Sequence, residues 1–336
     1  MDLNTLWFIL ITVLFSGFFV LEGFDYGVGT LLPFAAKTDT ERRVVLNTIG
    51  PHWDANEVWL LTAGGAIFAA FPNWYATLFS GFYLALFFIL LALIIRGVAI
   101  DFRSKYDNPT WRKTWDILFF IGSLLPSVLF GVAVSNFMTG VPIDANMEYA
   151  GNFFTLLTPF TLLGGVTFLL VLTFHGLLFL GLKNGVASIE NRVKAMSTKL
   201  GITMLVVTVI WVIYAAFTTN LLKNGILPII TVALAAVLLI AAVLLQHKAS
   251  TGKAFICSSL AIVMVTITVF ASMFPNVMIS TTSPDYSLTI YTASSSPYTL
   301  KIMTIVALTA VPVVLAYLAW SYWIFRKRVT EKDLHY

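Results

Sequence analysis

Charged residues are scarce in this sequence of 336 residues: Asp, Glu, Lys and Arg make up 11% of it, whereas hydrophobic residues make up 59%. A soluble globular domain carries roughly 25% charged residues, so the composition excludes that class. A helix needs about 20 consecutive apolar residues to cross a bilayer, and once such stretches are assigned, little chain is left over. The sequence therefore predicts a single integral membrane domain over residues 1–336.

Cysteine and histidine are also scarce. Cys257 is the only cysteine, which excludes an intramolecular disulfide and a CxxC site and predicts a small buried residue. Membrane b-type haems take buried His or Met ligands. Of the four histidines, His52 is predicted at a helix edge, His247 in a loop and His335 in the tail. Only His175 lies well inside a span, where we expect a hydrogen-bonded packing role. The sequence predicts no haem, copper or iron site in this chain.

The apolar runs are long and continuous, as in "LFFILLALII", whereas membrane β-strands would give short alternating segments. This pattern predicts an all-α fold with nine transmembrane helices. A division into two four-helix bundles and one peripheral helix fits that number. The predicted spans are residues 5–34, 54–72, 74–101, 114–139, 158–183, 200–222, 225–246, 253–275 and 299–326.

Basic residues are distributed unevenly between the two sides that nine spans define. Eighteen of the 20 Lys and Arg fall on one side, and only Lys223 and Lys301 fall on the other. Because basic residues concentrate in cytoplasmic connections, this predicts an N-terminus outside and a cytoplasmic C-terminus. The same rule explains the net charge of +4 without a nucleic-acid partner. The first span lacks a basic n-region and a cleavage site, so we expect it to remain as a helix.

A few ionisable residues lie within or at the ends of the predicted spans. A charge at the bilayer centre costs about 2.5–3.5 kcal/mol even on the lenient insertion scale, so each such residue is a functional candidate. The predicted topology brings four carboxylates of the first three spans, those of Asp25, Asp54, Glu57 and Asp101, to the cytoplasmic side together with the guanidinium of Arg96. The candidates are Glu22, Asp25, Asp54, Glu57, Arg96, Asp101 and His175.

Two pairs of acids are each spaced by three residues, Glu22 with Asp25 and Asp54 with Glu57. Residues three apart share a helix face, and burial together with mutual repulsion favours the protonated form of neighbouring carboxyl groups. This arrangement suits a proton relay, with Arg96 as the charge partner. In the alternative, the acids only pair with Arg96 or cap helix ends, as Asp54 would at the start of a helix.

Glycines surround the first acidic pair, in "EGFDYGVG" at residues 22–29. Small residues spaced by four let membrane helices approach closely. We therefore expect Gly23, Gly27 and Gly29 to mark a close helix crossing, and we interpret Gly64 and Gly65 in the same way.

Several segments resemble subunit II of cytochrome bd-type quinol oxidases. They are "EGFDYGVG" at 22–29, "DTERRVVLNTIGPHWDANEVWLLTAGGAIFAAFP" at 39–72, "FSGFYLAL" at 79–86, "DFRSKYDNPTWRKTWD" at 101–116, "YAGNFFTLLTPFTLLGGV" at 149–166, and "MFPNVMISTT", "SLTIYTASSSPYTLKIMT" and "AYLAWSYW" in the C-terminal third. The resemblance covers nearly the whole chain.

The resemblance implies a terminal oxidase of the bacterial plasma (inner) membrane, which oxidises quinol and reduces dioxygen to water. It assigns two b-type haems, one d-type haem and the quinol site to subunit I, which pairs with this chain as a heterodimer surrounded by lipid. It also allows a small accessory transmembrane subunit and a quinone bound in this subunit.

For the acids, the resemblance assigns Asp25 and Asp54 to a cytoplasmic proton pathway. Glu22 and Glu57 stand where some relatives carry another acid or an amide. The connection between the sixth and seventh spans is shorter here than in longer relatives.

Two rival functions remain open. A proton-coupled secondary transporter could use the same acids, but it predicts matched broken helices in two halves, and the sequence has no clear pair of them. A purely structural assembly subunit predicts acids that only pair and cap.

Overall fold

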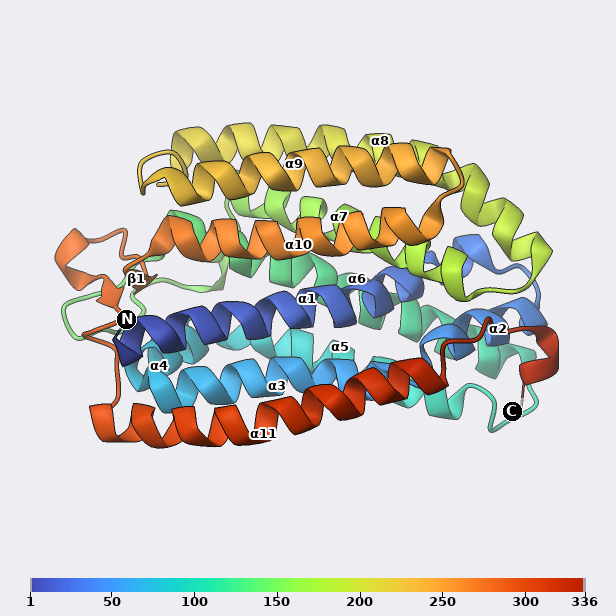
Figure 1. Cartoon of the computed structure of the whole chain (residues 1–336), viewed down its shortest axis with the longest axis horizontal. Coiled ribbons are helices and arrows are strands. Elements are labelled where there is room, and N and C mark those ends of the chain that lie inside the picture. The colour runs from blue at the N-terminus through green and yellow to red at the C-terminus, as the bar shows by residue number, and fades with distance from the viewer. Residues whose placement is uncertain (1, 335–336) are drawn as a thin grey trace.

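The computed structural model describes residues 2–334, and long helices running side by side account for most of them (Figure 1). The helices are α1 (Leu3–Ala35), α2 (Asp39–Ile49), α3 (Trp53–Ala70), α4 (Pro72–Gly81), α5 (Tyr83–Phe102), α6 (Pro109–Thr139), α7 (Pro159–Lys183), α8 (Ala187–Thr218), α9 (Ile226–His247), α10 (Thr251–Met273) and α11 (Pro297–Ile324). The shorter elements are η1 (Phe153–Leu156), β1 (Asn276–Met278), η2 (Pro284–Tyr286), β2 (Leu288–Thr289) and η3 (Glu331–Asp333).

Within residues 2–334, eight helices are long and apolar enough to cross a membrane, which confirms an all-helical multi-pass protein. The second predicted span (54–72), observed as α3, is not among them, because its first turns carry Asp54, Asn56 and Glu57. Its 18 residues would still span about 27 Å, and it packs along α1 and contacts α11. The count of nine therefore stays a prediction.

Three sequence predictions need correction. The predicted span 74–101 is divided at Phe82 into α4 and α5. Helix α8 begins at Ala187, well before residue 200, because hydropathy misses its polar first turns. Cys257 is half-buried rather than buried.

The helices can be divided into two groups and an edge helix (Figure 1), whereas the predicted division into two four-helix bundles stays a prediction. Helices α7 to α10 make one group, and α1 with α3 to α6 makes the other. Both α1 and α6 join the groups, because α1 packs on α7 and α10 and α6 packs on α7. Helix α11 lies at the edge against α1 and α3. The most apolar part of α11 has no buried residue, so lipid or another chain must cover it.

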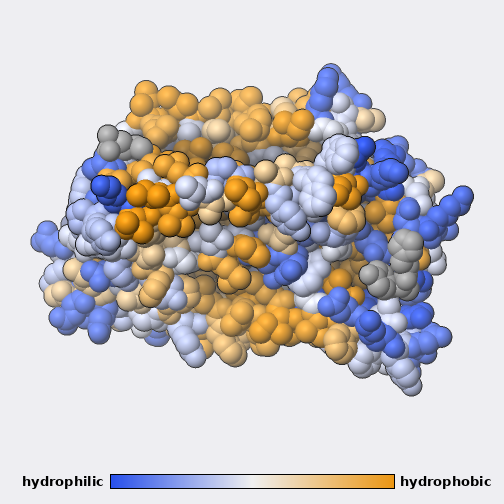
Figure 2. Space-filling model, turned by 60° about the horizontal axis from the view of Figure 1, so that its bottom comes forward, coloured by the Kyte–Doolittle hydropathy of each residue, from blue (hydrophilic) through white to orange (hydrophobic). Residues whose placement is uncertain are grey.

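The surface has an apolar belt between two polar ends, as a membrane protein requires (Figure 2). The start of α1 and the β1–β2 hairpin lie at one end of the bundle, and α2 and η3 lie at the other (Figure 1). These positions are compatible with the predicted topology, in which the two termini lie on opposite sides.

Glycines let α1 and α7 cross closely. A Cβ atom added to Gly27 would lie 2.0 Å from the carbonyl oxygen of Leu172 and 2.8 Å from Cα of Gly176, well inside van der Waals contact. The expectation for Gly27 is therefore confirmed. It is wrong for Gly64 and Gly65, because an added Cβ would meet nothing within 4 Å at either position.

Gly27→Leu should therefore abolish the assembled protein, because the backbone of α7 leaves no room for a side chain. Adding extra methylene groups to a packed core typically costs about 1–3 kcal/mol, and a whole leucine side chain at this crossing should cost more. We therefore expect membrane yield to fall at least tenfold. Gly252→Ala on α10 is the control, because its added Cβ would meet only Leu182 Cδ2, at 3.9 Å. Normal yield of Gly27→Leu would contradict the close crossing.

Candidate functional site

A cluster of buried charges lies where α1, α3 and α5 meet. The Arg96 side chain of α5 is fully buried and forms ion pairs with Glu22 of α1 and Glu57 of α3. Its Nη2 atom donates a hydrogen bond of 2.7 Å to Oε1 of Glu57. The structure thus confirms that these three predicted residues come together.

An aromatic ring completes the surroundings of Arg96. The guanidinium lies 4.7 Å from the ring centroid of Tyr26, within the range of a cation–π interaction. Tyr26 is itself buried. Tyr26 was not predicted as part of the site, although it directly follows Asp25 in the chain.

Asp25 is the other buried acid of α1, and it is held by an amide. Asn56 Nδ2 of α3 donates a hydrogen bond of 2.7 Å to Oδ2 of Asp25. Oδ1 of Asp25 receives no hydrogen bond from a donor among the described residues, and the carboxyl group of Glu22 lies within hydrogen-bond reach of Asp25. On the far side of the amide, the hydroxyl of Tyr322 from α11 donates to Oδ1 of Asn56 at 2.8 Å. Asn56 and Tyr322 were not predicted, because the cost of burying a charge singles out neither a neutral amide nor a neutral tyrosine.

His52 lies against the same tyrosine, directly before α3. Its ring stacks on Tyr322 with centroids 4.1 Å apart and planes 2° from parallel. Burial, with a smaller contribution from the charge of Lys183, lowers the pKa of His52 to about 4. The imidazole is therefore neutral at physiological pH and stacks as an uncharged ring.

Asp54 stands apart from the cluster. It lies in the first turn of α3, its side chain is exposed, and it has no hydrogen-bond or ion-pair partner among the described residues. A step of two residues turns a helix by about 200°, so Asp54 and Asn56 point in opposite directions. Asp101 is likewise exposed at the end of α5. The sequence predicted only that these acids lie near the same membrane face; among the described residues, Asp54 and Asp101 form no ion pair with Arg96.

His175 has the packing role that its surroundings in the sequence suggested. Its Nε2 lies 3.0 Å from the carbonyl oxygen of Val20, and its Nδ1 lies 3.0 Å from the hydroxyl of Ser258. A carbonyl only accepts, so Nε2 carries the proton and Nδ1 accepts from Ser258. The ring also stacks on Phe255 at 4.6 Å. Both nitrogens are thus used within the protein. His335 lies outside the described residues.

Comparison with known proteins identifies the family of this chain. The family model described as "Cytochrome bd terminal oxidase subunit II" matches residues 3–325. The chain belongs to this family. It is therefore a subunit of a bacterial oxidase complex and a multi-pass membrane protein.

Individual relatives agree with the subunit II family. The chain is 43% identical to "Cytochrome bd ubiquinol oxidase subunit 2" of Bacillus subtilis, over 99% of this chain and 98% of the relative. It is 38% identical to "Cytochrome bd-I ubiquinol oxidase subunit 2" of Escherichia coli K12, over 99% and 96%. A chain of the solved bd oxidase from Geobacillus thermodenitrificans matches with a TM-score of 0.75 and 15% identity, covering 97% of this chain and 99% of that one. This last match shows the fold.

Subunit II has a second charge network at the end of the bundle where α2 lies. Arg103 bonds to Asp116 of α6 at 2.6 Å and to Asp39 of α2 at 2.8 Å. Burial alone would lower the pKa of Arg103, but the hydrogen bonds that it donates to Asp116 and Asp39, together with their negative charges, outweigh burial and raise the pKa. Arg42 of α2 adds a 2.9 Å bond to Asp116. These contacts hold α2 against α5 and α6.

Glu41 ties the other side of α2 to α8. It closes a capping box with Thr38, pairs with Arg192 and accepts from the hydroxyl of Ser188. Burial raises the pKa of Glu41, but the hydrogen bonds from Arg192, Ser188 and two backbone amides lower it to about 2. The ionised carboxylate is the form that holds α2 in place.

Glu41→Gln should therefore destabilise subunit II in a pH-dependent way. A depressed pKa stabilises the fold above the unfolded value of 4.5, and this contribution is lost as pH falls toward about 2. We expect a cost on the order of 2 kcal/mol at pH 7. The melting temperature of the purified complex should differ between wild type and Glu41→Gln at pH 7 and converge below pH 4.5. A difference that does not change with pH would contradict this role.

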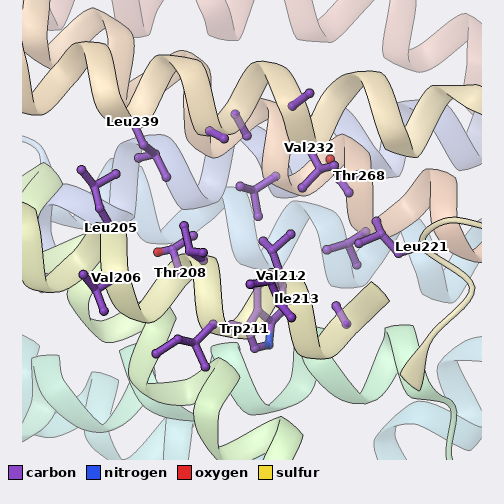
Figure 3. Close-up of a pocket in the computed structure, with 18 of the residues that line it drawn as sticks. Leu205, Val206, Thr208, Trp211, Val212, Ile213, Leu221, Val232, Leu239 and Thr268 are labelled. Carbon is purple, nitrogen blue, oxygen red and sulfur yellow. The ribbon is translucent and has the colours of Figure 1, made fainter. Parts of the chain in front are cut away.

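A separate hollow lies between α8, α9 and α10 (Figure 3). It has a volume of about 550 Å³, and most of the side chains around it are apolar, among them Leu205, Val212 and Leu239. Thr208 Oγ1 and Trp211 Nε1 are buried beside it without hydrogen-bond partners among the described residues. Such a space suits a hydrocarbon chain.

Proposed function

We propose that this chain is the haem-free subunit II of a quinol:oxygen oxidoreductase and that it contributes a cytoplasmic proton pathway. The observation that carries the proposal is the buried cluster of Glu22, Asp25 and Glu57 around a single cation, Arg96. The proposal also includes an outside N-terminus and a cytoplasmic α2 and η3.

The cluster has more acidic groups than basic ones. Three carboxyl groups share one guanidinium, and the described residues include no second cation paired with Glu22 or Glu57. Fully ionised, the cluster would carry two excess negative charges in a medium that hardly solvates them. Binding protons is the least costly way to restore neutrality, so the cluster holds exchangeable protons.

The exposed fraction of the acidic side chains falls from Asp54 through Glu57 to Glu22. Asp54 is exposed, the Glu57 side chain one turn later is 20% exposed, and Glu22 is fully buried. Residues three apart share a helix face, so Asp54 and Glu57 lead from the chain surface to the buried cluster. We infer that Asp54 exchanges protons across this surface with the partner subunit, while Asp25 and Glu22 hold them inside.

The redox chemistry belongs to the partner in this proposal. Subunit I would carry the two b-type haems and the d-type haem, oxidise quinol and reduce dioxygen to water. In the described bundle interior, His175 has both ring nitrogens occupied by Val20 and Ser258, so it offers no free imidazole to a haem. A small accessory transmembrane subunit is compatible with the uncovered face of α11.

A quinone site within this chain is a separate part of the proposal. If subunit II holds a quinone, the hollow beside Trp211 is where its apolar tail fits (Figure 3). The indole N–H and the Thr208 hydroxyl are the polar groups beside that space.

The two rivals differ in what they predict. A proton-coupled transporter would accumulate a solute when this chain alone is placed in vesicles. A purely structural subunit would lose complex yield, but not turnover per complex, when its acids are neutralised.

One purification tests the proposed function. The tagged chain is isolated from its native membrane, and a reduced-minus-oxidised spectrum is recorded with the masses of co-purifying proteins. We expect b- and d-type haem bands together with a larger partner. A colourless single chain that moves a solute would overturn the proposal.

A further inference from the structure

The amide of Asn56 has a fixed orientation. Its Nδ2 faces two acceptors, Oδ2 of Asp25 at 2.7 Å and the backbone carbonyl of Leu21 at 3.3 Å. A flipped amide would set its carbonyl oxygen against both acceptors. On the opposite side, Tyr322 donates its hydroxyl proton to Oδ1 at 2.8 Å. The partners on both sides therefore select the same orientation.

Tyr322 comes from the outermost helix, and its position is itself secured. Its ring stacks flat on that of neutral His52, with the two ring centroids 4.1 Å apart. Beyond it, Lys183 of α7 binds the carbonyl oxygens of Phe325 and Lys327, the second at 3.1 Å. The end of α11 is thus anchored to α7, and the Tyr322 hydroxyl is held at the amide.

Building on the proposed proton pathway, we propose that Tyr322 and Asn56 are positioning residues for proton exchange at Asp25. The Tyr322 hydroxyl locks the Asn56 amide, the amide occupies Oδ2 of Asp25, and Oδ1 is left as the oxygen that gains and loses the proton. Oδ1 receives no hydrogen bond from a donor among the described residues, which fits an atom used for exchange, and the neighbouring carboxyl group of Glu22 lies within hydrogen-bond reach of Asp25.

The chain of hydrogen bonds cannot itself carry protons to Asp25, because a neutral amide has no proton to spare at neutral pH. Its effect is on the balance between the two forms of Asp25. An N–H donor stabilises the carboxylate relative to the acid, so removing it lets the protonated form persist to higher pH. The other titratable or charged groups around this carboxyl are Glu22, Tyr26, Glu57, Arg96 and Tyr322.

The test is the pH profile of oxygen consumption by the intact complex at matched haem content. Asn56→Leu should move the alkaline limb upward by about one pH unit, and Tyr322→Phe by about half a unit. Tyr322→Phe keeps the ring that stacks on His52, so it should assemble even if Asn56→Leu does not. Tyr214→Phe on α8, a tyrosine that contacts Phe160 through its ring, is the matched control and should not shift the profile.

An infrared difference spectrum gives a readout independent of turnover. The carboxyl band that disappears in Asp25→Asn should shift in Tyr322→Phe and stay in place in Tyr214→Phe. If Asp25→Asn slows turnover but neither the pH profile nor this band moves in Tyr322→Phe, the positioning role is refuted while the proton pathway stands. If Asp25→Asn leaves turnover unchanged, the proton pathway fails, and the positioning role fails with it.

Discussion

Asp25→Asn should slow oxygen consumption on the order of 10- to 100-fold in a fully assembled, haem-loaded complex, the scale at which a positioned acid–base group acts. Asn keeps the shape of the side chain and can still bond to Asn56, which holds Asp25 at 2.7 Å. What it loses is the proton that the carboxyl group exchanges. The measurement is oxygen uptake with excess quinol, normalised to haem.

Asp101→Asn is the matched control for this change. Asp101 lies at the same end of the bundle on α5, but its side chain is exposed and does not contact the cluster. We expect turnover of Asp101→Asn to stay within twofold of wild type. Equal turnover of both variants would leave Asp25 with a structural role only.

Arg96→Met should strongly reduce assembly. Met has a similar length but no charge, so Glu22 would be left buried without its cation, and Glu57 would lose a 2.7 Å bond. Removing one partner of a buried ion pair costs about 3–5 kcal/mol, which is a large part of the free energy of unfolding of a typical domain. We expect complex yield and melting temperature to fall sharply, as measured by size-exclusion chromatography and thermal denaturation.

A second substitution separates the charge from the packing. In Arg96→Met combined with Glu22→Gln, the uncompensated charge is removed, so much of the lost yield should return. Arg326→Met, at an exposed arginine after α11, is the control and should assemble normally. Failure of the double variant to recover any yield would mean that Arg96 acts through its shape and its contact with Tyr26 rather than through charge.

The fold followed from the sequence wherever a span is a continuous apolar run. The first span was predicted at 5–34 and is observed as Leu3–Ala35. The prediction failed where helices continue in polar sequence, as in the first turns of α8, because apolar content marks the membrane and not the end of a helix. It also failed at Gly65, since spacing alone does not say which face of α3 another helix covers.

The charged part of the site was predictable because burying Glu22, Asp25 or Arg96 is costly and therefore informative. The uncharged residues of the site were not predictable from the sequence. Asn56 and Tyr322 are 266 residues apart in the chain and meet only because α11 folds back against α3. The exposure of Asp54 was also hidden, because its separation from Asn56 depends on which side of α3 faces α1.

Proton uptake by the intact oxidase, reconstituted in one orientation in vesicles, tests the central claim most directly. Fully reduced enzyme is given a pulse of oxygen, and a pH dye reports uptake on the side that carries α2 and η3. We predict rapid uptake from that side in the wild type and uptake at least tenfold slower in Asp25→Asn, with unchanged haem spectra. Uptake at the wild-type rate in Asp25→Asn, or uptake from the opposite side, would contradict a cytoplasmic proton pathway through this subunit.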